Sequence, residues 1–202
     1  MWYPLRNLSM IAPLAVLHFA AYAVLNRYPV FPCRRLPLTI IDEAIPFWPA
    51  TAYPYLLINV AAIVLPLLVR DVRVFRRLIA AYAIAMGTAA LFFLLLPTCY
   101  PRPPVPPTDL GSAAYLWLIS VDTPRCCFPS AHILVPTLAC AALWRDGRRG
   151  GVALPLAIGA CLLTILTTKQ HYLWDLFGGL AVAAIGWYLT RRMTPRNDAC
   201  CK

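Results

Sequence analysis

The sequence predicts an all-α membrane protein, a polytopic helical bundle of about six transmembrane helices. Two observations lead to this fold class. Hydrophobic residues make up 61% of the 202 positions and charged residues only 13%, with a mean hydropathy of +0.68. Ordinary soluble domains are about half apolar and a quarter charged. Because each crossing helix needs about 20 apolar residues, one such bundle uses most of the chain, and we expect residues 1–202 to form a single membrane domain.

Uninterrupted apolar stretches give the predicted spans. They run over residues 7–25, 50–69, 78–96, 126–144, 150–168 and 172–190. The first is expected to stay in the membrane, because a single Arg6 precedes it and no small-residue cleavage site follows it.

Three connecting segments have their own patterns. Residues 36–49 carry Asp42 and Glu43 and are too short to cross, so they are predicted as an interfacial or re-entrant piece. Residues 97–109 contain six prolines, which predicts a stiff extended loop. Residues 112–121 are predicted as a short helix at the outer membrane surface.

The charges give an orientation. The net charge is +10, but Lys and Arg fall in short clusters between uncharged runs, which argues against a nucleic-acid partner. With the N-terminus inside, twelve basic residues lie on the inner side and six on the outer side, so both termini are expected in the cytoplasm. A bacterial inner membrane is our first expectation, and an internal eukaryotic membrane fits the charge bias equally.

The eight cysteines show no metal-ligand spacing. If the outer face is oxidising, Cys99 could pair with Cys126 or Cys127, and free thiols are the favoured alternative.

Histidines stand where two predicted spans begin on the outer side, at His132 and His171. His171 and Asp175 are four residues apart, so on a helix they share a face, and the carboxylate can accept a hydrogen bond from one imidazole nitrogen. Two interpretations stay open from these residues alone: a structural polar pair that fixes helix packing, and a catalytic pair whose second nitrogen is a nucleophile or base.

Cations and hydrogen-bond donors accompany both histidines. Arg102 lies in the outer proline-rich loop, Ser130 is two residues before His132, and Lys169 is two residues before His171. Such a cluster at helix starts suits a phosphate, through charge-assisted hydrogen bonds and free backbone N–H groups. The pattern therefore predicts phosphoryl transfer. The sequence has no carboxylate cluster suited to a metal, so neither a metal nor a cofactor is expected.

These residues resemble the motifs of the type 2 phosphatidic acid phosphatase superfamily. Its members carry K-x-x-x-x-x-x-R-P, then P-S-G-H, then S-R-x-x-x-x-x-H-x-x-x-D. In this chain the matching positions are Arg102-Pro103, Pro129-Ser130-Ala131-His132, and His171 with Asp175, followed by Gly178-Gly179. Leu95 and Ile165 stand where the family has Lys and Arg, and we expect Lys169 to supply the missing charge.

The resemblance implies a mechanism and a substrate class. His171 would attack phosphorus, Asp175 would hold its tautomer, and His132 would protonate the leaving alcohol and later activate the acceptor. The residues expected to bind the phosphate oxygens are Arg102, Ser130 and Lys169. A membrane lipid in the surrounding bilayer is the expected partner, with its head group reaching the site at the extracytoplasmic surface.

Other functions stay open. The residues of the second and third motifs resemble those of the branch with inositol phosphorylceramide and sphingomyelin synthases. The acceptor of the phosphoryl group is therefore either water or a lipid alcohol. A different class is a non-catalytic member or small transporter in which His171 and Asp175 relay protons.

Overall fold

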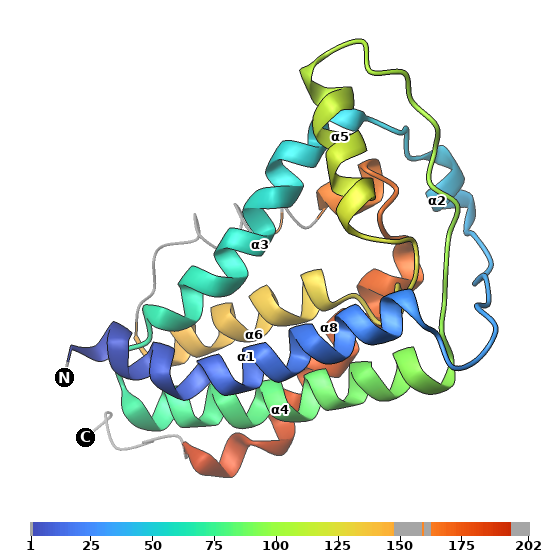
Figure 1. Ribbon diagram of the computed structural model, residues 1–202. Coiled ribbons are helices and arrows are strands. Elements are labelled where there is room, and N and C mark those ends of the chain that lie inside the picture. The colour runs from blue at the N-terminus through green and yellow to red at the C-terminus, as the bar shows by residue number, and fades with distance from the viewer. Residues whose placement is uncertain (1, 148–158, 160–162, 195–202) are drawn as a thin grey trace.

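The computed structural model describes residues 2–147, 159 and 163–194, and in this part of the chain regular structure is helical, without a β-strand. Elements are labelled as in Figure 1. They are α1 (Tyr3–Arg27), α2 (Ile40–Ala44), η1 (Pro49–Thr51), α3 (Ala52–Leu67), α4 (Val72–Leu95), α5 (Leu110–Val121), α6 (Ala131–Arg145), α8 (Leu173–Leu189) and η2 (Arg191–Met193). The predicted all-α class is confirmed.

Three segments among the described residues are long and apolar enough to cross a membrane, Tyr3–Arg27, Pro49–Leu67 and Val72–Leu95. These agree with the first three predicted spans. The apolar helices α6 and α8 are shorter, with 15 and 17 residues. Helix α8 lies inside the sixth predicted span, and α6 lies inside the fourth except for its last residue, Arg145. The fifth predicted span, residues 150–168, falls mostly outside the described residues, so a count of six stays a prediction.

The connecting segments follow their sequence patterns. The proline-rich residues 97–109 form no helix, and the predicted short helix that follows them is α5. In the segment 36–49 the only α-helix is the five-residue α2, whose start is capped reciprocally by Thr39 and Asp42.

The core lies where α4 packs against α6 and α8, and α1 covers α3 and α4 from outside (Figure 1). Small residues allow this close packing. On α4, Ala81, Ala85 and Ala89 are fully buried, and a Cβ built on Gly186 of α8 would lie 3.0 Å from the Ala81 carbonyl oxygen. Small residues at such contacts are typical of membrane helices, which gain their association free energy from close packing.

Large apolar side chains cover the outside of the bundle. On α1, Val16, Leu17 and Phe19 are each more than 60% exposed, and Leu57 and Ile63 of α3 are more than half exposed. A soluble protein rarely exposes such a continuous apolar surface, whereas lipid chains solvate it. This surface and the apolar helices are those of an integral membrane protein.

One end of the bundle, which we call the arginine end, joins the start of α1, the α3–α4 turn, the end of α6 and the end of α8. The Asn7 amide donates to the Val69 carbonyl at 2.6 Å, and the Asp146 carboxylate accepts from the backbone N–H groups of Arg70 and Asp71. The Arg77 guanidinium donates to Thr194 Oγ1 at 2.8 Å. The arginine end carries Arg6, Arg70, Arg73, Arg76, Arg77 and Arg145.

The other end, which we call the loop end, holds α2, α5 and the segments that connect the helices there (Figure 1). Isolated β-bridges join Arg34 to Thr98 and Cys99 to Arg125, so three segments distant in sequence lie side by side. Both histidines of the predicted site are at this end, because His132 begins α6 and His171 precedes α8.

Candidate active site

His171 lies in the short turn that leads into α8. The backbone N–H groups of Gln170 and His171 both donate to the Ile165 carbonyl at 3.1 Å, and Lys169 has a positive φ of 51°. These bonds close the end of one helical segment immediately before the next helix begins. These backbone contacts hold His171 in place, and its side chain is only 8% exposed.

Asp175 binds both the imidazole and the start of α8. Its Oδ2 lies 3.3 Å from His171 Nδ1 and accepts a hydrogen bond from the Tyr172 backbone N–H at 3.0 Å. The predicted contact of His171 with Asp175 is therefore present, but its geometry differs from the expectation. Because α8 begins at Leu173, His171 precedes the helix and the two residues do not share a helical face. The contact leaves Nε2 as the second imidazole nitrogen.

His132 lies in the first turn of α6, beside His171. The two ring centroids are 5.4 Å apart, and the His132 ring also lies 5.0 Å from that of Tyr55 on α3. The Ser130 backbone N–H donates to the Asp175 carbonyl oxygen at 3.1 Å. The starts of α6 and α8 are thus joined directly, and the structure brings the two histidines together as the motif pattern predicted.

This junction requires glycine on α8. A Cβ built on Gly179 would lie 2.7 Å from the Ser130 carbonyl oxygen and 2.9 Å from the Ile133 Cβ. No side chain fits at that distance without movement of backbone. Gly179 therefore fixes how closely α8, which carries Asp175, approaches the start of α6.

Arg102 reaches this junction from the proline-rich loop. Its Nη1 donates to the Lys169 carbonyl at 3.1 Å, and its positive charge acts on His132, Tyr55 and Tyr172. The Arg102 Nε is buried and has no hydrogen-bond partner within the described residues. The structure therefore brings Arg102 to the histidine pair, with part of its guanidinium unpaired.

Lys169 extends its side chain toward α2. Its Nζ donates to the carbonyl oxygens of Asp42 at 2.8 Å and Ile45 at 2.6 Å, while Asp42 Oδ1 accepts from the Leu173 backbone N–H at 2.9 Å. Burial lowers the pKa of the Lys169 ammonium, and the Asp42 carboxylate partly opposes this shift. Lys169 and Asp42 together connect α2 to the turn that holds His171, so the ammonium is engaged by α2.

Within the described part of the chain, buried polar atoms without partners occur at residues of this junction, and also at Tyr100 and at Arg77 of the arginine end. Those that the sequence pattern had singled out are Arg102 Nε, Ser130 Oγ and Asp175 Oδ1. Tyr55 Oη and both polar atoms of the Gln170 side chain are also unpaired among the described residues, and the sequence analysis missed both residues. Gln170 stands directly before His171, which was a usable signal, whereas Tyr55 lies in an apolar span with no motif around it.

The unpaired donors among these groups suit an oxyanion. A buried polar group in a native structure normally has a partner, so unpaired ones indicate a bound molecule or water. The guanidinium and the hydroxyl can donate to phosphate oxygens. The described residues contain no group of three or more His, Cys, Asp or Glu that could hold a metal ion, and metal independence stays a prediction.

The model of the PAP2 superfamily matches residues 31–189, which include the loop end and every predicted site residue. The chain belongs to the PAP2 superfamily. The resemblance to type 2 phosphatidic acid phosphatases is thereby confirmed, and membership supports a phosphatase or phosphotransferase type of function on lipids. No curated protein and no solved structure matches the chain. Within the PAP2 superfamily, the branch to which this chain belongs stays a prediction.

Proposed function

We propose that this PAP2-superfamily protein is a metal-independent lipid phosphatase or phosphotransferase that acts through a phosphohistidine on His171. One observation carries the proposal. The His171 imidazole has a buried carboxylate on Nδ1 and a second imidazole 5.4 Å away, among unpaired buried donors. This is the arrangement of an activated nucleophile with a separate general acid.

The groups act in two steps. His171 Nε2 attacks phosphorus, the bond from phosphorus to the head-group or lipid oxygen breaks, and His132 donates its proton to that leaving oxygen. Asp175 holds the His171 tautomer and stabilises the positive charge that develops on the ring. In the second step His132 takes a proton from the acceptor, whose oxygen attacks the phosphohistidine and releases His171.

Charge on the transferring phosphoryl group is stabilised by Arg102 and Ser130, whose unpaired Nε and Oγ donate to its non-bridging oxygens. Lys169 was expected to bind the same oxygens. Since its ammonium binds the carbonyl oxygens of Asp42 and Ile45, we propose that Lys169 acts indirectly, by keeping the turn that carries His171 in position.

The position in the membrane supports a lipid substrate. With the arginine end in the cytoplasm, both termini are cytoplasmic and the histidines lie at the extracytoplasmic face. A lipid can then present its phosphate to the loop end while its chains stay in hydrocarbon. A bacterial inner membrane with these termini inside is the arrangement that we propose.

The acceptor separates two versions of this function. With water as the acceptor the protein is a phosphatase, and with a lipid alcohol it is a transferase of the inositol phosphorylceramide synthase type. The residues of the second and third motifs favour the transferase. A proton relay through His171 and Asp175 is the rival class. A proton relay gives no role to Arg102, Ser130 or His132, so we favour an enzymatic function.

The experiment traps the covalent intermediate. The purified full chain in detergent is mixed with phosphatidate labelled in its phosphate, with EDTA present, and quenched in base, which preserves phosphohistidine. We expect label on the protein, and none on His171→Ala, whose turnover should fall at least about a thousandfold. Ser120→Ala, an exposed α5 position, is the control and should label like the unchanged chain.

The same assay identifies the acceptor. Free phosphate in water alone indicates the phosphatase, and a new phospholipid formed on addition of ceramide or diacylglycerol indicates the transferase. Turnover by folded His171→Ala at the unchanged rate, or label on another residue, would remove His171 as nucleophile. Absence of turnover on every phospholipid tested would favour the proton relay.

A further inference from the structure

Two cysteines line the same pocket at the loop end, outside the candidate active site. Cys33 follows α1 and Cys99 follows α4, and their segments are joined by the parallel β-bridge between Arg34 and Thr98. The Arg34 N–H donates to the Pro97 carbonyl at 2.8 Å, and the Cys99 N–H donates to the Arg34 carbonyl at 3.0 Å. Cys33 precedes and Cys99 follows the bridged pair, so the two are diagonal neighbours, and the alternation of side chains turns both to the face opposite those of Arg34 and Thr98.

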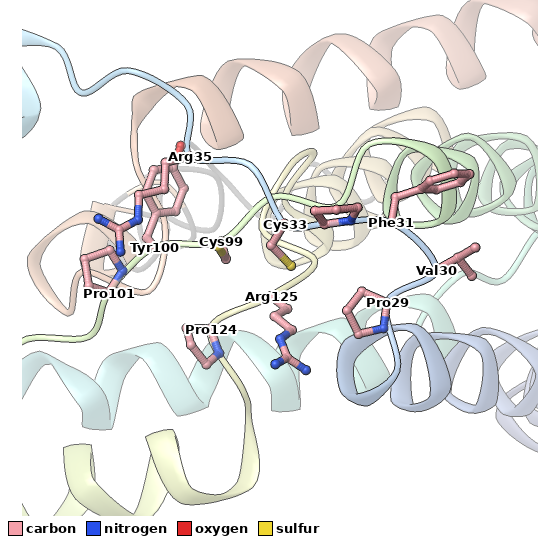
Figure 2. A pocket seen from close by; sticks show the side chains of 11 residues that line it. Pro29, Val30, Phe31, Cys33, Arg35, Cys99, Tyr100, Pro101, Pro124 and Arg125 are labelled. Carbon is pink, nitrogen blue, oxygen red and sulfur yellow. The ribbon is translucent and has the colours of Figure 1, made fainter.

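Both are free cysteines, each partly exposed, and the Cys99 thiol acts electrostatically on that of Cys33. Both line an open pocket of about 630 Å³ whose other walls include Arg35, Tyr100 and Arg125, as Figure 2 shows. The pair is therefore accessible to a small reagent from that pocket.

The partners for Cys99 expected from the sequence, Cys126 and Cys127, are less accessible. Cys126 is buried, and Cys127 is buried in a cluster with Tyr100 and Tyr172. Neither lines the pocket. Among the described cysteines, Cys33 and Cys99 are the two that line this pocket, which makes Cys33 the accessible partner for Cys99.

We propose that Cys33 and Cys99 form a reversible disulfide by exchange with a small anionic disulfide that enters this pocket. The pocket favours a negatively charged reagent because two arginines line it. The cross-link would fasten the segment before α2 to the segment that carries Arg102. The proposal goes beyond the proposed lipid reaction and does not depend on it.

The exchange balances with the external disulfide as oxidant. One cysteine thiolate attacks a sulfur of that disulfide, whose S–S bond breaks and releases one thiol. The second cysteine thiolate then attacks the mixed disulfide, forms the Cys33–Cys99 bond and releases the other thiol. The two cysteines lose two electrons and two protons, and the external disulfide gains both. Burial and the neighbouring Cys99 thiol raise the pKa of Cys33, and Arg125 opposes this, so the exchange should accelerate as the pH rises above neutral.

The test uses the purified full chain in detergent. It is incubated with oxidised glutathione, blocked with maleimide, digested without reduction and read by mass spectrometry. We expect a linked fragment containing Cys33 and Cys99 that dithiothreitol removes, formed about tenfold faster at pH 8 than at pH 7. The apparent unfolding temperature of the oxidised chain should be several degrees higher than that of the reduced chain.

Matched variants complete the test. Cys33→Ser and Cys99→Ser should each abolish the linked fragment and the shift in unfolding temperature, and Cys140→Ser, a partly exposed cysteine of α6, should change neither. A fragment linking Cys99 to Cys126 or Cys127, or maleimide on both Cys33 and Cys99 after oxidation, would overturn the proposal. Because the readout is the cross-link, it fails or succeeds independently of lipid turnover.

Discussion

At the residue scale, Tyr55 has a buried hydroxyl without a hydrogen-bond partner in the described part of the chain, which packing alone does not explain. The residue is 1% exposed, its ring lies on His132, and its hydroxyl has no partner among the described residues. Burial of an unpaired hydroxyl disfavours folding by about 1–3 kcal/mol. A tyrosine kept for packing alone gains nothing from that hydroxyl, so we infer that Tyr55 Oη donates to a group of the bound substrate.

This inference predicts an asymmetric effect for Tyr55→Phe. The change keeps the ring beside His132 and removes only the hydroxyl, so turnover of a phospholipid should fall about tenfold, the loss of one hydrogen bond worth about 1.4 kcal/mol. The unfolding temperature should stay the same or rise, because an unpaired polar group is removed. Turnover and unfolding temperature are measured on the same detergent preparation.

Tyr82→Phe is the matched control for this prediction. Tyr82 is equally buried, but its hydroxyl donates to the Val135 carbonyl at 3.1 Å in the α4–α6 contact. Its loss should lower stability by about 1 kcal/mol and leave the turnover of folded protein unchanged. An effect of Tyr55→Phe on stability with unchanged turnover would show that the two tyrosines have the same, structural role.

The same scale shows what the sequence could and could not predict about the site. His132, His171 and Asp175 could be predicted from local motifs, because each imidazole stands near a recognisable helix start and the carboxylate is four residues from His171. The direction of the Lys169 side chain is set by carbonyls of α2 more than 120 residues earlier, which no local spacing encodes.

At the scale of the elements, apolar runs predict which segments are helical better than where each helix begins. The fourth predicted span starts at residue 126, but α6 starts at Ala131, because Cys126 has a positive φ of 55° and Pro129 precedes the Ser130 cap. The residues before Ala131 instead form the loop that contacts α8. Hydropathy alone cannot separate such a loop from a helix when both are apolar.

The contact between α6 and α8 makes a prediction about Gly179. Gly179→Ala introduces a Cβ 2.7 Å from the Ser130 carbonyl oxygen, so α8 must move away from α6 and Asp175 with it. We expect a loss of stability of about 1–3 kcal/mol and a loss of turnover of at least about tenfold, because displaced catalytic groups react poorly.

Gly87→Ala on α4 is the control for that change. A Cβ there meets nothing within 4 Å, and alanine favours helix over glycine, so stability should stay the same or rise by up to about 1 kcal/mol with unchanged turnover. Thermal unfolding and phospholipid turnover of both variants decide between the two outcomes. Equal behaviour of Gly179→Ala and Gly87→Ala would show that the close approach of α6 and α8 does not position the site.

At the scale of the whole molecule, each end of the bundle engages some of its cations within the fold and exposes others. At the loop end, Arg125 donates to the Arg27 carbonyl and Arg102 to that of Lys169, while Arg34 and Arg35 are exposed. At the arginine end, Arg6 donates to the Arg70 carbonyl and Arg77 to that of Trp187, while Arg73 and Arg76 are exposed. Four of the twelve basic residues expected inside, Arg148, Arg149, Arg196 and Lys202, lie outside the described residues. The sequence count cannot separate engaged from exposed cations, and the proposed orientation rests on that count alone.

The orientation predicts opposite labelling of the two ends in intact bacterial cells that express the chain. Thr108→Cys is exposed in the proline-rich loop, and Arg73→Cys is exposed at the arginine end and still leaves the basic residues biased to that side. A membrane-impermeant maleimide should modify Thr108→Cys at once and Arg73→Cys only after permeabilisation, with each site read by mass spectrometry. The reverse pattern would place the histidines in the cytoplasm, where a lipid of the inner leaflet would be the substrate and the reducing environment would keep Cys33 and Cys99 as free thiols.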